Sequence, residues 1–114
     1  MRWLNLLHII MQRREIVDLA ARAVRTLAPD AKIILYGSEA RGEARADSDI
    51  DLIVLLNERY VSPGREFEIM SVVCDVELQT AVQISTRVTT IDEWEHPTIC
   101  TPFYINVCNE GIFV

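Results

Sequence analysis

The sequence predicts an α/β protein in which helices alternate with short strands around one hydrophobic core. A helix-periodic segment comes first, two short apolar runs of β-forming residues follow it, and a β-branched, alternating stretch comes later. The length of 114 residues suits one domain with one core. A composition of 50% hydrophobic and 25% charged residues is typical of globular proteins and argues against wholesale disorder.

The first helix is predicted over residues 12–28. Its apolar positions recur every third or fourth residue and include Ile16, Ala20, Ala23 and Leu27. Residues 32–36 (KIILY) form a short apolar run and predict a buried strand, which Gly37 ends. Residues 38–48 are polar and predict a loop with room for one helical turn, and residues 50–56 predict the second strand.

Residues 66–79 fit two interpretations. The segment VVCDVEL within them could form a strand, but four apolar residues have helical spacing, and we favour a helix. These four are Phe67, Met70, Cys74 and Leu78. Residues 81–90 are β-branched and alternating, which predicts a third strand.

The closing part of the chain predicts small elements. Residues 92–94 suggest a short helical turn, and residues 103–110 predict a short helix with Gly111 as its C′ residue. The last three residues, 112–114, are apolar enough to dock against the protein.

The charge balance is acidic, with 17 Asp and Glu against 11 Lys and Arg and a net charge of −6. Binding to the backbone of DNA or RNA needs a basic face, so generic nucleic-acid binding is not expected. The cysteines form no CxxC pair and predict reduced, buried thiols in a cytoplasmic protein. The histidines lie outside any zinc-binding spacing. These residues are Cys74, Cys100, Cys108, His8 and His96.

Residues 1–10 form an apolar segment that Asn5 and His8 interrupt. It is shorter than the ~20 apolar residues of a membrane span and lacks the cleavage site of a signal peptide, so no membrane association is expected. Two alternatives stay open. The segment is an extension that packs on the domain or on a partner, or the natural start is Met11.

The segment from Tyr36 to Leu52 contains the residues suited to chemistry. The first strand runs into Gly37-Ser38, where glycine permits a close approach of the backbone. If Ser38 opens a helical turn, its hydroxyl and the free N–H groups suit a phosphate. Arg41 is close enough in sequence to add positive charge there.

Asp49 and Asp51 stand two residues apart at the start of the second strand. Strand alternation places both carboxylates on one face, with Cα atoms roughly 6.5–7 Å apart. The pair could share a cation with oxygen ligands at ~2.0–2.1 Å, as for Mg²⁺, which would remove the repulsion that otherwise raises the pKa of one of them. Each motif is weak alone; together they predict phosphate and metal ligands at the ends of two neighbouring strands.

Residues 35–56, LYGSEARGEARADSDIDLIVLL, resemble the signature of the nucleotidyltransferase superfamily that includes DNA polymerase β. They resemble in particular the minimal nucleotidyltransferases of the MntA-like antitoxin group. Weaker similarity extends through residues 93–95 and 102–112, so most of the chain from residue 12 is covered. The resemblance implies the nucleotidyltransferase fold, a short mixed sheet flanked by helices, formed by residues 11–114 as a single domain.

The resemblance also implies an NTP substrate, with ATP as the first candidate, and Mg²⁺ as cofactor. The nucleotide-binding residues would be Gly37, Ser38, Arg41 and Ser48. Asp49 and Asp51 would be the catalytic metal ligands of a two-metal transfer in which pyrophosphate leaves. Related proteins are encoded beside HEPN-domain toxins, and some transfer AMP to a tyrosine of the toxin and so silence it.

The sequence departs from the family at the third carboxylate. Active members carry one on a later strand, where it completes the metal site and can accept the proton of the attacking hydroxyl. The corresponding position here is Gln83, which is neither a base nor an anion. Asp75 or Glu77 could fill the role if VVCDVEL were a strand, whereas on a helix both would be surface acids.

Three functional hypotheses follow. The first is an enzyme that moves an NMP to a hydroxyl, with a toxin tyrosine as acceptor. The second is a catalytically weak antitoxin subunit that acts by complex formation. The third, transfer to a small molecule such as an aminoglycoside, usually needs a further helical domain. Because the chain is short, acceptor choice would come from a HEPN-type helical partner or from a second copy in a homodimer.

Overall fold

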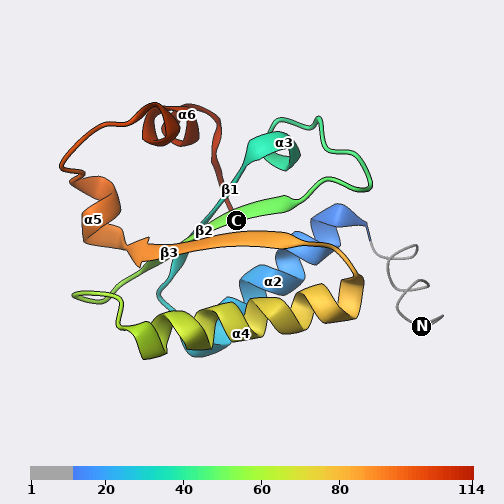
Figure 1. Ribbon diagram of the computed structural model, residues 1–114, viewed down its shortest axis with the longest axis horizontal. Coiled ribbons are helices and arrows are strands. Elements are labelled where there is room, and N and C mark those ends of the chain that lie inside the picture. The colour runs from blue at the N-terminus through green and yellow to red at the C-terminus, as the bar shows by residue number, and fades with distance from the viewer. Residues whose placement is uncertain (1–11) are drawn as a thin grey trace.

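A computed structural model describes residues 12–114, and its elements are labelled as in Figure 1. The extension predicted at residues 1–10 lies outside the described residues. Four strands form one sheet in the order β3-β2-β1-β4. β1 is antiparallel to β2 and to β4, whereas β2 is parallel to β3. The strands are β1 (Lys32–Tyr36), β2 (Ile50–Leu56), β3 (Ile84–Thr90) and β4 (Ile112–Phe113).

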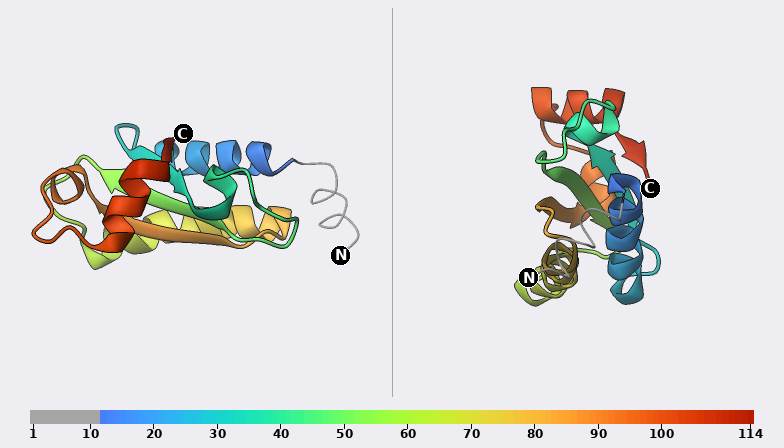
Figure 2. Two further views of the ribbon diagram at one scale, coloured as in Figure 1. Left: turned by 90° about the horizontal axis from the view of Figure 1, so that it is seen from above. Right: turned by 90° about the vertical axis from the view of Figure 1, so that its right-hand side faces the viewer.

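Helices lie on both sides of this sheet. Figure 2 shows α2 (Arg13–Leu27) and α4 (Pro63–Thr80) together on one side and α6 (Pro102–Glu110) on the other. The short helices α3 (Gly37–Ala40) and α5 (Ile91–Glu95) follow β1 and β3 directly. The predicted α/β fold, a short mixed sheet flanked by helices, is confirmed.

The core has two parts because strand side chains alternate between the two faces. The larger part lies under α2 and α4 and includes Ile33 and Leu52. The smaller part lies under α6, where Ile34, Ile53 and Val107 pack together. β1 and β2 are therefore covered on both faces, which explains their continuous apolar sequence.

The helix predicted at residues 66–79 is confirmed, but it is longer and faces differently. It begins at Pro63, because Ser62 caps it by accepting a hydrogen bond from the backbone N–H of Arg65 at 3.1 Å. The residues that face the core are Ile69, Val73, Val76 and Thr80. The four apolar residues that suggested the helix, Phe67, Met70, Cys74 and Leu78, are exposed.

The third strand begins at Ile84, three residues later than predicted. Ala81 has a φ of +60°, a left-handed conformation that ends α4 and delays the strand. The prediction of buried thiols is wrong, because all three cysteines are free and exposed. No helix among residues 12–114 is long and apolar enough to cross a membrane.

The predicted C-terminal helix and docked tail are both present. The helix ends at Glu110, and β4 pairs with β1. Gly111 has an extended backbone rather than the left-handed conformation of a C′ glycine. It is required for another reason, since a Cβ there would overlap the carbonyl oxygen of Val107 and Cγ2 of Ile34.

Candidate active site

The turn between β1 and α3 brings Gly37 against Asp51. Tyr36 lies opposite Asp51 in the antiparallel pairing of β1 and β2, so the next residue reaches the start of β2. Gly37 has a φ of +75°, and a Cβ on it would overlap Oδ2 of Asp51. Glycine alone meets both demands. The two predicted motifs therefore meet at the ends of neighbouring strands, as the sequence suggested.

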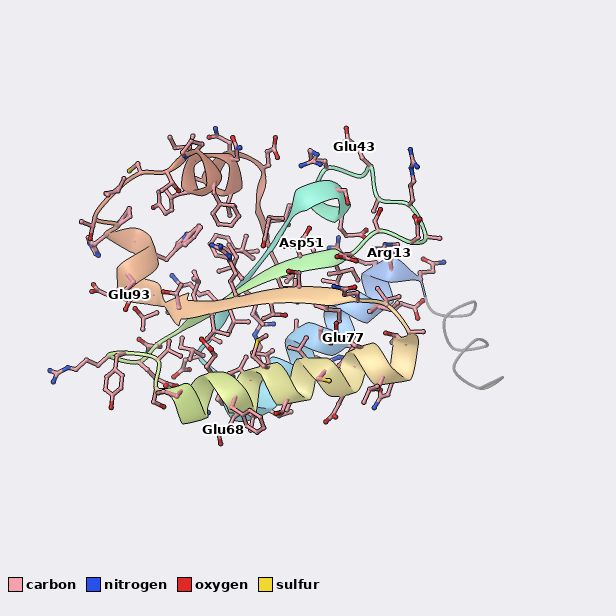
Figure 3. The ribbon with its side chains drawn as sticks, in the orientation of Figure 1. Arg13, Glu43, Asp51, Glu68, Glu77 and Glu93 are labelled. Carbon is pink, nitrogen blue, oxygen red and sulfur yellow. The ribbon has the colours of Figure 1, made fainter. Side chains whose placement is uncertain are left out.

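Asp49 and Asp51 interact electrostatically at the start of β2. Burial raises the pKa of the Asp51 carboxyl, the charge of Asp49 raises it further, and Arg41 lowers it. Figure 3 shows Asp51 on the side of β2 that faces away from α4. Two repelling carboxylates provide hard oxygen ligands, and a divalent cation between them would relieve the repulsion. The residues present therefore fit a divalent cation with two anionic ligands.

The neighbouring strand supplies polar rather than acidic residues beside this pair. Ser85 of β3 lies opposite Asp51, and the carbonyl of Gln83 accepts a hydrogen bond from the N–H of Ile50 at 2.9 Å. Strand alternation then places the side chains of Gln83 and Ser85 on the face of Asp49 and Asp51. Within residues 12–114, no group of three His, Cys, Asp or Glu side chains could hold a metal ion.

The two acids considered as a third ligand lie on the opposite side of the sheet. Glu77 projects from α4, as Figure 3 shows, and its carboxylate accepts a hydrogen bond from the N–H of Ile84 at 2.8 Å. That contact fixes the start of β3. Asp75 is exposed on the same helix. Both are therefore helical acids outside the candidate site.

Arg41 and Ser48 lie at the edges of the site. Arg41 is exposed and pairs with Glu43 at 2.8 Å and with Glu110 of α6 at 3.4 Å. The Ser48 hydroxyl accepts a hydrogen bond from the N–H of Arg45 at 2.9 Å. Arg41 thus extends the site toward α6, while Ser48 shapes the loop that leads into Asp49.

Two hollows flank the aspartate pair. One lies between residues 46–49 and residues 81–83, and Asp49 and Gln83 form part of its lining. The other lies between the β1–α3 turn and α6, and Gly37 and Arg41 line it. The first hollow therefore reaches Asp49 directly, and the second borders the glycine that contacts Asp51.

An aromatic cluster lines the site on the side of α6, and sequence reasoning missed it. The rings of Tyr36 and Phe103 pack edge to face at 5.5 Å, and the Arg87 guanidinium lies 4.5 Å from the Phe103 ring centre. Burial raises the pKa of Tyr36, Asp51 raises it further, and Arg87 lowers it. These residues are far apart in the sequence, so no local pattern links them.

Sequence reasoning also missed Arg13. Its guanidinium donates hydrogen bonds to Glu39 of α3 and to carbonyl oxygens of the loop before β2. In the sequence, Arg13 and Arg14 are equivalent cations at the start of a helix. They differ in their contacts, because Arg13 binds carbonyl oxygens of a loop that lies 33 to 35 residues later in the chain.

Comparisons with known proteins show the family and the fold of the chain. The family model described as "nucleotidyltransferase domain" matches residues 17–103 of the chain. Among solved structures, the chain resembles a candidate nucleotidyltransferase from Sulfolobus solfataricus, with a TM-score of 0.52 and 17% identity. That match covers 87% of this chain and 76% of the other, and at this identity it shows the fold alone. No curated protein matches the chain significantly.

Proposed function

Because the chain belongs to the nucleotidyltransferase domain family, we propose that it transfers an NMP from an NTP to a hydroxyl group, with Asp49 and Asp51 as metal ligands. The contact between Gly37 and Asp51 is the observation that carries this proposal. It joins a glycine-containing turn suited to phosphate with a carboxylate suited to a cation. An NTP·metal complex needs these two features side by side.

Each part of the site has a proposed role. Gly37 and Ser38 bind the terminal phosphates of the NTP. Arg41 adds positive charge to the phosphates, since its present partners are exposed carboxylates whose pairing is weak. Ser48 contacts the bound nucleotide at the edge of the site. The cation, when bound, stabilises negative charge on the phosphate oxygens.

The reaction is an in-line displacement at the α-phosphorus. The acceptor oxygen forms a bond to that phosphorus, the bond to the bridging oxygen breaks, and pyrophosphate leaves. The acceptor must also lose its proton. Neither Gln83 nor Ser85 is a base at neutral pH, so we propose that the proton passes to solvent or to a group of the acceptor protein.

The finer form of the proposal rests on the resemblance of residues 35–56 to MntA-like antitoxins. In this form the NTP is ATP, the cation is Mg²⁺, and the acceptor is a tyrosine of a HEPN-type helical partner. In this form the partner also provides the surface that holds the acceptor tyrosine. A second copy of the chain is the alternative source of that surface.

One observation favours a second candidate function. The described residues provide two carboxylates and no third metal ligand of the usual kind. A chain with this site could bind the nucleotide and neutralise its partner by complex formation alone.

Intact mass spectrometry of a co-expressed partner tests the two candidates. The enzyme hypothesis predicts that the partner encoded by the neighbouring gene gains the mass of one nucleotidyl group. We expect Asp49→Ala and Asp51→Ala to abolish this gain. Asp47→Ala, which removes an exposed acid from the same loop, serves as the matched control and should preserve it. An unmodified partner in a stable complex with the wild-type chain would favour the second candidate.

A further inference from the structure

Arg13, in the first turn of α2, connects two separate parts of the candidate site. Its Nε donates a hydrogen bond to Oε1 of Glu39 at 2.5 Å. Its terminal nitrogens donate to the carbonyl oxygens of Ala46 at 3.2 Å and Ser48 at 2.6 Å. The side chains of Arg13 and Glu39 are each 18% exposed, so solvent screens this ion pair less than one on the open surface.

The acceptors of Arg13 lie beside the two motifs that must act together. Glu39 is on α3, two residues after Gly37, and Ser48 immediately precedes Asp49. The loop between them has its own local hydrogen bonds, such as the one between the Arg45 N–H and the Ser48 hydroxyl. Those bonds shape the loop, whereas Arg13 reaches it from another element. The guanidinium therefore fixes where the loop lies relative to α3.

Stabilisation of α2 does not explain this placement. A positive side chain in the first turn of a helix faces the positive end of the helix dipole, which is unfavourable. The helix is held instead by core residues such as Ile16 and Val17, which are at most 1% exposed. Arg13 thus projects from a firmly anchored element, and a rigid support suits a residue that positions a loop.

We propose that Arg13 is a positioning residue for nucleotidyl transfer. By binding Glu39 and the two loop carbonyls, it holds α3 against the loop that leads into Asp49 and so keeps Asp49 in place beside the phosphate-binding turn. The kinetic part of this inference rests on the proposed function, whereas the structural part does not. A misplacement of about 1 Å can cost roughly 100-fold in rate, so a loosened loop should lower kcat more than it raises KM.

Two measurements on the full chain test the proposal. The first is amide hydrogen exchange without nucleotide. We expect exchange in residues 43–49 to be about tenfold faster in Arg13→Met, as expected when a charge-assisted contact is lost. Arg14→Met, which changes the exposed neighbouring arginine, is the matched control and should leave exchange unchanged. Urea unfolding of each variant distinguishes local loosening from a general loss of stability.

The second measurement is steady-state transfer with NTP and Mg²⁺. For Arg13→Met we expect kcat to fall about 10- to 100-fold, with KM for the NTP changed less than about threefold. Arg13→Lys should recover part of kcat, because an ammonium keeps the charge but lacks the fork that reaches all three acceptors.

The outcomes separate this proposal from the proposed function. Unchanged exchange in Arg13→Met overturns the inference whatever the activity. Faster exchange with an unchanged kcat also overturns it, because the contact would then be structural alone. If the wild-type chain transfers no nucleotide, the proposed function fails, while the exchange measurement still decides whether Arg13 holds the loop.

Discussion

The backbone of Gly37 and the carboxylate of Asp51 occupy adjoining space, so that no side chain fits at position 37 without displacing Oδ2. The register of β1 and β2, with Tyr36 opposite Asp51, sets this contact. Gly37 belongs to the turn and Asp51 to the aspartate pair, so the two motifs form one structural unit. A substitution at either residue should therefore alter the position of the other.

We expect Gly37→Ala to be more damaging than Gly42→Ala. The two glycines have φ values of +75° and +74°, so both substitutions carry the same backbone strain. A Cβ at Gly42 meets no atom within 4 Å, whereas one at Gly37 meets Asp51. We expect the free energy of unfolding to fall by about 1–2 kcal/mol in Gly42→Ala and by about 1–2 kcal/mol more in Gly37→Ala.

Urea unfolding measures these losses, and a transfer assay shows whether the site is affected. We expect Gly42→Ala to retain activity and Gly37→Ala to lose it. Similar losses of stability and activity in the two variants would contradict a specific role for the contact with Asp51.

The raised pKa of Asp51 predicts how stability depends on pH. Between the ordinary aspartate pKa of about 4 and the raised pKa of Asp51 in the folded protein, the folded state binds more protons at Asp51 than the unfolded chain does. This contribution to stability is present at low pH and is lost as pH rises through the folded pKa. We therefore expect Asp51→Asn to gain free energy of unfolding relative to wild type as pH rises above about 4 in cation-free buffer.

Urea unfolding in EDTA over this pH range measures that difference. The exposed Asp47→Asn is the matched control and should follow the wild-type curve. Addition of Mg²⁺ at ten times its Kd should stabilise the wild type by about 1.4 kcal/mol and Asp51→Asn by less. A constant difference between wild type and Asp51→Asn at all pH values would contradict the electrostatic interpretation.

The orientation of α4 shows where sequence periodicity succeeds and fails. Two apolar stripes lie at helical spacing on this segment, so its helical nature is predictable. Which stripe faces the core depends on how α4 packs on α2 and the sheet. The structure buries Ile69 and Val73 and exposes Phe67 and Leu78. A single sequence does not carry that three-dimensional information.

Paired substitutions on α4 test this orientation. We expect Ile69→Ala to lower the free energy of unfolding by about 2–5 kcal/mol, because it leaves a cavity in the core. Leu78→Ala should change it by less than about 0.5 kcal/mol, since Leu78 is 65% exposed. Thermal or urea unfolding measures both changes. A larger loss of stability in Leu78→Ala than in Ile69→Ala would contradict this assignment of the buried and exposed faces of α4.

The sequence predicted those parts of the site that belong to short, continuous motifs. Gly37, Asp49 and Asp51 could be placed together because each motif marks the end or start of a strand. The contacts of Arg13 and the wall formed by Tyr36 and Phe103 join segments distant in the sequence, and they depend on packing. The fold and the motif centre were thus predictable, whereas the supporting contacts were not.

Gln83, which immediately precedes β3, gives the sharpest test of the missing carboxylate. Gln83 and Asp49 line the same hollow, so Gln83→Glu would introduce a third acid of nearly the same shape. We expect tighter binding of Mg²⁺ and a transfer rate raised about 100-fold if the new carboxylate accepts the proton of the acceptor. Without cation, three neighbouring carboxylates should lower stability.

Gln79→Glu is the matched control, because it makes the same chemical change at an exposed position of α4. It should leave cation affinity and rate unchanged. Calorimetry with Mg²⁺ and the transfer assay measure the two effects separately. Tighter cation binding without a faster transfer would assign the third acid a role in metal binding only, and would locate the proton acceptor in the partner or solvent. No change in either quantity would contradict the placement of Gln83 beside the aspartates.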